Sequence, residues 1–184
     1  MDIQIEVIEP EPVQGPVPSC EFLPLLADNL EKYADRQTTG RVFRVEDEYN
    51  PDREEETEEV VKMCVLGVAF ITASQCKAPE FDVEAWIKEQ NTDPDKHIVD
   101  TDEAISAIGA FLPREDRREL SLEIERLDPR FGTYKEVVSA TYPHNNPIME
   151  YKPLDLYVLN DDWKIDFKTM AQAVRNYAAK KQAA

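Results

Sequence analysis

The segment at residues 59–75 constrains the fold of this 184-residue chain more than any other. Apolar residues fill it almost continuously, so a helix formed here has no polar face to show to water and must be buried nearly all round. Gly67 lowers the stability of such a helix by about 1 kcal/mol relative to Ala. The expected reason for a glycine at this position is the close approach of another backbone segment. The remaining elements are therefore expected to pack around this helix.

Amphipathic helices are the expected partners of the buried segment. Apolar residues recur at helical spacing in several other stretches, each with a charged opposite face. In the last stretch, Met170, Val174 and Tyr177 are expected to point inward, and Asp162 or Asp166 is expected to cap the helix. The predicted helices span residues 22–35, 81–90, 101–112, 114–127 and 167–181, with a shorter one at 133–141.

Short strands and a turn complete the predicted fold. Leu154, Leu156 and Val158 alternate with polar residues, which predicts a strand, and a weaker alternation predicts another at residues 41–45. Residues 160–162 read as a turn and 142–153 as a loop. A strand at 2–8 and a Pro-rich linker form residues 1–19. The expected fold class is thus α+β, with residues 20–184 forming a predominantly helical single domain that has a small β-sheet.

The overall acidity of the chain limits its possible partners. The formal net charge is -17, and the residues from Ile105 onward are balanced, so all of the excess lies before Ile105. Such a surface argues against direct binding to nucleic acids or to anionic membranes. No apolar run approaches the roughly 18 residues that span a bilayer. Three cysteines without metal-type spacing, and no secretory signal, predict free thiols and a cytoplasmic location.

The acidic excess is concentrated in two windows. Residues 46–59 contain nine acids and one base and are interpreted as an exposed acidic loop, whereas residues 79–104 contain nine acids and two bases. One interpretation is a solubilising face. The other is phosphate mimicry, because duplex DNA carries a charge about every 1.7 Å and carboxylates at similar density would attract a basic groove.

The second interpretation predicts a non-enzymatic interaction protein, bacterial or phage-encoded. It would bind and inhibit a basic, nucleic-acid-handling protein, with no cofactor. Tyr49 and Trp86 are the expected apolar anchors within the patch. The residues expected to bind the partner are Glu46, Asp47, Glu48, Tyr49, Asp52, Glu54, Glu55, Glu56, Glu58, Glu59, Asp82, Glu84, Trp86, Asp93 and Asp95.

Two other classes of function stay open. A small enzyme would use Cys64 as nucleophile with His97 or His144 as base, or Asp161 in a carboxylate site; this requires a thiolate beside an imidazole in a pocket. Against it, Cys64 lies in the most apolar stretch, where a thiol is usually an inert hydrophobe. The third class is a homo-oligomeric structural or regulatory module.

A calcium loop at residues 91–102 is a further alternative. Asn91, Asp93, Asp95 and Asp102 place oxygens at four of the ligand positions of a twelve-residue loop between two predicted helices. However, Lys96 stands where the sharp turn requires Gly, and Asp102 replaces the bidentate Glu. A degenerate acidic connector is therefore the preferred interpretation, and no metal is expected.

Three short motifs carry a resemblance to a known family. They are residues 25–30 (Leu-Leu-Ala-Asp-Asn-Leu), residues 64–67 (Cys-Val-Leu-Gly), and Asn160-Asp161 before the final helix. In this order they resemble an uncharacterised family found in bacteria and their phages. The resemblance implies a related fold and such a source, and it implies no activity. The acidic insert at 46–59 is additional to the family pattern.

Overall fold

Helix α2 (Val65–Lys77) is the centre of the fold in the computed structural model, which describes residues 21–49, 57–93, 97–131 and 154–183. Nine of its thirteen residues are buried, so the expectation of a helix enclosed on nearly all sides is confirmed. It starts later than predicted, however, because residues 57–63 form a strand. Within that stretch Val61 and Met63 are buried, while Val60 and Lys62 are half-buried, and this alternation is typical of a strand.

The sheet is an antiparallel hairpin of β1 (Phe43–Tyr49) and β2 (Thr57–Met63). Phe43 pairs with Met63 and Val45 with Val61, so the apolar base of the hairpin faces the core. The prediction of an acidic loop at 46–59 is therefore wrong for residues 46–49 and 57–59, which are strand. β-Branched valines at the base favour extended structure and fix the register, and the acids continue outward along the same ladder.

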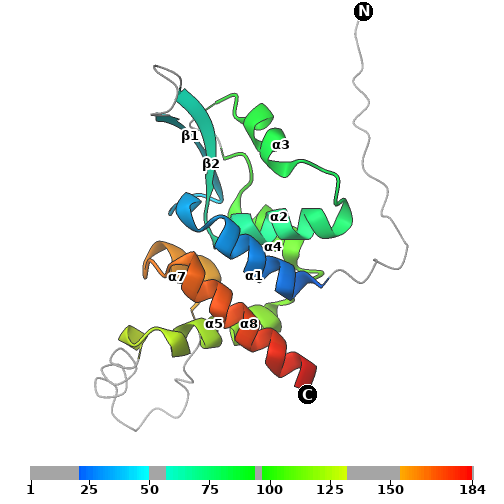
Figure 1. Ribbon diagram of the computed structural model, residues 1–184, viewed down its shortest axis with the longest axis vertical. Coiled ribbons are helices and arrows are strands. Elements are labelled where there is room, and N and C mark those ends of the chain that lie inside the picture. Colours follow the sequence, from blue (N-terminus) through cyan, green and yellow to red (C-terminus); the bar gives the residue numbers. More distant parts are fainter. Residues whose placement is uncertain (1–20, 50–56, 94–96, 132–153, 184) are drawn as a thin grey trace, which may run out of the picture.

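Helices surround α2 on the remaining sides (Figure 1). Helix α1 (Phe22–Lys32), followed by the short 3-10 helix η1 (Ala34–Arg36), packs on both α2 and α8 (Phe167–Ala183). Helix α5 (Arg114–Leu127) packs against α8, and α4 (Thr101–Ile108) against α2. The inward positions predicted for the last helix are confirmed, because Met170, Val174 and Tyr177 are all buried. The molecule is therefore a predominantly helical α+β domain with one small sheet.

Helix α7 (Leu156–Asp161) stands where a strand and a turn were predicted. Leu156 and Leu159, three positions apart, are buried on one side of this short helix, whereas Val158 is only half-buried. The strand predicted from the alternation of Leu154, Leu156 and Val158 is therefore wrong. A stretch of six residues is too short to distinguish the two-residue period of a strand from the 3.6-residue period of a helix. The predicted turn at 160–162 is wrong for Asn160 and Asp161, which end this helix, and is confirmed for Asp162.

Gly67 confirms the close approach expected in α2. A Cβ built at this position would lie 2.4 Å from the carbonyl oxygen of Val42 and 2.8 Å from the Cβ of Met63. The Val42 carbonyl also accepts a hydrogen bond from the backbone N–H of Cys64 at 3.1 Å. The chain before β1 therefore lies directly on the first turn of α2, and only glycine leaves room for it.

Several predictions concern residues outside the described ranges. They are the strand at 2–8 and the linker after it, the helix at 133–141, and the loop at 142–153 that contains His144. These stay predictions.

Candidate functional site

The acids of the first window lie on the hairpin. Asp47 pairs in register with Glu59, and Glu48 with Glu58, so two successive rungs of the ladder are acidic on both strands. All four side chains are exposed. Like charges placed directly opposite each other destabilise a two-stranded ladder, so this arrangement costs the fold stability rather than adding to it. We call Glu46, Asp47, Glu48, Glu58 and Glu59 the hairpin surface.

The two acidic rungs face opposite sides of the hairpin. Successive side chains of a strand alternate between its faces, so Asp47 and Glu59 lie on one face and Glu48 and Glu58 on the other. Acid pairs at every second rung of one face would give a charge about every 3.4 Å, which is half of the linear density of duplex DNA with both strands counted. The acidic pairing extends over two described rungs, since Glu46 pairs with Val60. Residues 50–56, which include the expected Asp52, Glu54, Glu55 and Glu56, lie outside the described ranges.

Basic residues of the same hairpin neutralise part of the charge of the hairpin surface. Nζ of Lys62 lies 2.7 Å from a carboxylate oxygen of Glu48 and 3.1 Å from one of Glu46, and Nε of Arg44 lies 3.2 Å from the other oxygen of Glu46. The hydrogen bonds that Lys62 donates to the carboxylates of Glu48 and Glu46 raise the pKa of Lys62, so it stays charged at neutral pH. The acids left for a partner are those that form no ion pair with any described residue, namely Asp47, Glu58 and Glu59.

Helix α3 (Val83–Gln90) places the second window beside the first. It packs against both β1 and β2, and Figure 1 shows it next to the hairpin at one end of the molecule. Exposed Asp82 caps this helix by accepting a hydrogen bond from the backbone N–H of Ala85 at 3.0 Å. Glu84, by contrast, is engaged inside the fold. It pairs with Arg36 at 2.6 Å and accepts the hydroxyl hydrogen bond of Tyr33 at 2.8 Å.

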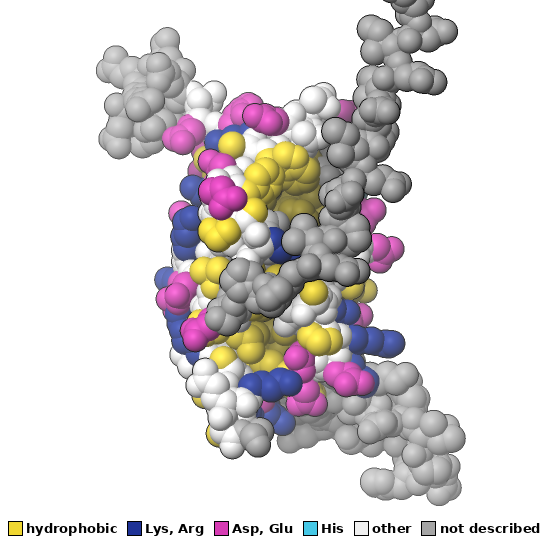
Figure 2. All heavy atoms as spheres, turned by 90° about the vertical axis from the view of Figure 1, so that its right-hand side faces the viewer, with side chains coloured by type: hydrophobic (Ala, Val, Ile, Leu, Met, Phe, Trp, Pro, Cys, Tyr) yellow, Lys and Arg dark blue, Asp and Glu magenta, His cyan; other side chains and the backbone are white. Residues whose placement is uncertain are grey.

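A row of aromatic rings leads from the core to the surface next to these acids. The ring of buried Phe43 contacts that of Phe70 edge-on, with 5.8 Å between the ring centroids. The rings of Phe70 and Trp86 are stacked at a centroid distance of 6.3 Å, and the centroid of Phe81 lies 6.3 Å from that of Trp86. Trp86 is half-buried, and Phe81 at the outer end is 44% exposed. Figure 2 shows hydrophobic side chains gathered on the upper part of one face, with acidic side chains at their border. Phe81 was not among the predicted anchors, although it lies five residues before Trp86.

The remaining residues of the second window do not form a metal site in the part of the chain that the structure describes. Asn91 ends α3, Asp93 is exposed, and Asp102 lies in the first turn of α4. Asp95 lies outside the described ranges. No group of three or more His, Cys, Asp or Glu side chains among the described residues has the arrangement needed to hold a metal ion.

Three of the four residues proposed for an enzyme lie around one small cavity. The cavity has a volume of about 40 Å³, and Cys64, His97 and Asp161 form part of its lining. Asp161 is held there by the backbone N–H of Gly40, which donates to its carboxylate at 2.9 Å. Burial raises the pKa of the Cys64 thiol to about 11, so the thiolate needed for nucleophilic attack is nearly absent at neutral pH. His144, the fourth of these residues, lies outside the described ranges.

The prediction of free thiols holds for Cys64 and is wrong for Cys76. Cys64 is free and buried. Cys76, in the last turn of α2, is disulfide-bonded. Sequence alone gave no indication of this bond, because the three cysteines show no spacing typical of a disulfide framework.

A second cavity was not foreseen from the sequence. Its volume is about 90 Å³, and Arg114, Arg117 and Arg118 of α5 form part of its lining. In the sequence these residues read only as the mixed-charge outer face of a helix. Their spacing at i, i+3 and i+4 was the available signal, because residues three and four apart are neighbours on the surface of a helix.

Comparisons with family models, with curated proteins and with solved structures find no match for this chain. None of the helices in the described ranges combines the length and the apolar character needed to cross a membrane.

Proposed function

We propose that this protein is a non-enzymatic interaction protein that binds and inhibits a basic, nucleic-acid-handling protein through the hairpin surface and α3. The observation that carries the proposal is the pair of acidic rungs formed by Asp47, Glu48, Glu58 and Glu59. They place a pair of neighbouring carboxylates on each face of the hairpin. A basic groove shaped for phosphates would be attracted to them at long range and with strong salt dependence.

The position of α3 supports the proposal further. Because α3 packs on both strands, the two acidic windows adjoin each other in the described part of the chain. Phe81 and Trp86 add an exposed apolar edge to the charged surface. Interfaces gain most of their affinity from such aromatic anchors, whereas exposed charges mainly steer the encounter. The combination is therefore suited to a specific partner rather than to solubility alone.

The proposal is tested by quantitative capture from a bacterial lysate at low and moderate salt. The wild-type chain is compared with a triple variant, Asp47→Lys, Glu58→Lys and Glu59→Lys. We expect the wild type to retain a basic nucleic-acid-binding protein whose yield falls as salt rises, and the variant to lose it. A matched control reverses Glu21, Glu119 and Asp162, three exposed acids outside both windows, and is expected to bind like the wild type. Equal loss in both variants would show that only net charge matters, and would refute a specific surface.

A small enzyme is the second candidate, and one observation favours it: Cys64, His97 and Asp161 share a cavity. The raised pKa of the thiol opposes it. The reactivity of Cys64 therefore decides between the two candidates.

A cytoplasmic location also belongs to the proposal. Disulfides are rare in reducing compartments, so the disulfide bond of Cys76 opposes this part, and the redox state of Cys76 in cells tests it directly. A thiol that is reduced in cells would support the cytoplasm, and an oxidised one would contradict it.

A further inference from the structure

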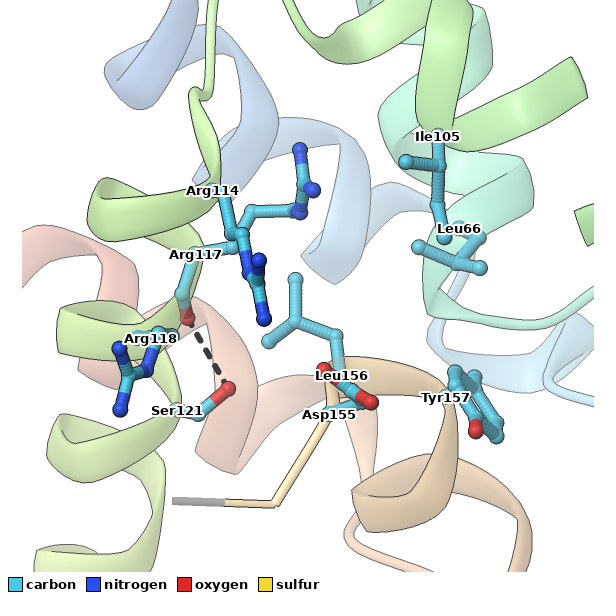
Figure 3. A pocket seen from close by; sticks show the side chains of 9 residues that line it. All are labelled: Leu66, Ile105, Arg114, Arg117, Arg118, Ser121, Asp155, Leu156 and Tyr157. Atoms are coloured by element: carbon cyan, nitrogen blue, oxygen red, sulfur yellow. Dashed lines mark hydrogen bonds between the residues drawn. The ribbon is translucent and has the colours of Figure 1, made fainter. Parts of the chain in front are cut away.

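Three arginine residues of α5 line part of the larger cavity, whose other lining residues come from α2, α4 and the region of α7. Figure 3 shows Arg114 and Arg117 at the start of α5, with one of their two guanidinium groups beside Leu156 of α7 and the other pointing away from it. Arg118 also lines the cavity, and its guanidinium turns to the other side of α5. Leu66 and Ile105 form the apolar wall across from the arginines. A chain with 38 acids and 21 Lys or Arg thus brings three cations to one hollow.

These arginines differ from most other described cations in having no carboxylate partner. Arg36, Arg44, Lys62, Arg130 and Arg175 all form ion pairs. Arg114, Arg117 and Arg118 form none with any residue in the described ranges. One guanidinium nitrogen of Arg117 donates to the carbonyl oxygen of Leu112 at 2.9 Å, which holds its side chain in place and leaves its other donors available.

The placement of these charges is unfavourable for the protein alone. Arg114 is the first residue of α5, and the other two follow within its first five residues. Cations near the N-terminus of a helix oppose its dipole, and three neighbouring cations repel one another. An anion bound between them would relieve both effects.

Charge and volume indicate the class of anion. Asp155, just before α7, is the acid that lines the same cavity, so Arg114, Arg117 and Asp155 give a net charge of +1 there, and Arg118 adds a further positive charge at the rim. A phosphoryl group carries a charge of about -1.5 to -2 near pH 7, whereas a single carboxylate carries only -1. The cavity of about 90 Å³ has room for roughly three waters at about 30 Å³ each, which suits one phosphoryl group.

We propose that this cavity binds the phosphoryl group of a small molecule, with Arg114 and Arg117 as its principal ligands. Guanidinium forks match phosphate oxygens in bidentate geometry, and Arg118 adds positive charge at the rim. Tyr157 lines the cavity as well and is 39% exposed, so the rest of such a molecule can lie against its ring where the cavity opens to solvent. This site is separate from the hairpin surface, and its test does not depend on the protein partner.

The test measures thermal stability and calorimetric binding with inorganic phosphate at about 10 mM, against chloride at equal ionic strength. We expect phosphate to raise the midpoint of unfolding of the wild type by a few degrees. The double variant Arg114→Gln and Arg117→Gln should lose this shift and bind phosphate at least tenfold more weakly. A variant with the same change in net charge, Arg44→Gln and Lys168→Gln, should respond like the wild type, because both residues lie outside the cavity lining.

Two further arms keep the test decisive. Acetate should give no shift, and a shift as large as that with phosphate would overturn the choice of a phosphoryl group. The variant Arg114→Lys and Arg117→Lys keeps the charge and removes the forks, so it covers the case in which the glutamine variant fails to fold; we expect several-fold weaker binding. No shift in the wild type, or equal shifts in the wild type and both cavity variants, would refute the site.

Discussion

The side chains of Gln37 and Asn160 are joined by a hydrogen bond of 2.9 Å, although 123 positions separate them in the sequence. Asn160 is fully buried, and its amide also donates to the carbonyl oxygen of Thr38 at 2.8 Å. Gln37 in turn donates to the carbonyl oxygen of Ile165 and accepts from the backbone N–H of Phe167. The pair thus ties the segment after η1 to the junction of α7 and α8.

Replacing Asn160 should expose the importance of this connection. Asn160→Ala removes a hydrogen-bond partner from the Gln37 amide and from the Thr38 carbonyl. Each buried polar group that loses its partner lowers the free energy of unfolding by about 1–3 kcal/mol. We expect the free energy of unfolding to fall by about 2–4 kcal/mol in a denaturant titration. The control is Asn176→Ala, which removes only an exposed bond to Gln172 and should change stability by less than about 0.5 kcal/mol.

Substitution by alanine should lower the stability of the protein at Gly67 but not at Gly109. At Gly67 the new Cβ meets the Val42 carbonyl at 2.4 Å, so overpacking of about 1–3 kcal/mol exceeds the gain in helix propensity. At Gly109 the nearest atoms lie at 3.4 Å and the backbone is already helical. Gly109→Ala is therefore expected to be neutral or to stabilise by up to about 1 kcal/mol. Thermal unfolding of both variants checks this, and equal effects would contradict the packing described for α2.

The contribution of Asp166 should depend on pH. Its carboxylate accepts hydrogen bonds from the backbone N–H and the hydroxyl of Thr169, both at 2.9 Å, and so caps α8. Burial alone would raise the pKa of Asp166, but the bonds from Thr169 outweigh it and the pKa is lowered. A lowered pKa means that the stabilisation is present above the unfolded-state value, about 3.9, and is lost as pH falls through the folded-state value.

Asp166→Ala should accordingly cost about 0.5–2 kcal/mol at pH 7 and progressively less below about pH 4. Denaturant titrations across this range provide the measurement. Asp166→Asn keeps a capping oxygen and cannot titrate, so it should retain most of the stability at pH 7. A loss in the alanine variant that stays constant down to pH 2 would contradict a cap made by the ionised carboxylate.

Cys64 should react slowly in the native protein. With a pKa of about 11, only about a thousandth of the thiol is ionised at pH 8. Alkylation by iodoacetamide, located by mass spectrometry, should therefore be much slower in the native state than after unfolding in guanidinium. His97→Ala should not change the native rate. Rapid alkylation that depends on His97 would instead favour the enzyme candidate.

The sequence predicted most of the helices because their apolar spacing is long enough to define a period. Residues 167–181 illustrate this, since α8 buries the expected positions. The hairpin was missed because its outer residues are acids, which have low strand propensity, and because the register depends on pairing between residues 43–49 and 57–63. Helix α7 was missed because six residues give too few repeats to tell the two periods apart.

The candidate site was predictable in composition and not in arrangement. The acidic windows were evident, but their contact through α3 arises from tertiary packing. Glu84 was assigned to a partner, whereas its pairing with Arg36 and Tyr33 depends on η1 lying next to α3. The arginine cavity has the same origin, because Leu66 of α2 and Leu156 of α7 join its lining from positions far away in the sequence.

Competition with duplex DNA tests the central claim most directly. The immobilised protein is loaded with the basic proteins that it retains from a bacterial lysate, and DNA is then added at constant ionic strength. If the hairpin surface imitates phosphates, DNA should displace those proteins that the Asp47, Glu58 and Glu59 reversal variant fails to retain. Proteins that stay bound at saturating DNA, or that bind the reversal variant equally well, would contradict the proposed mimicry.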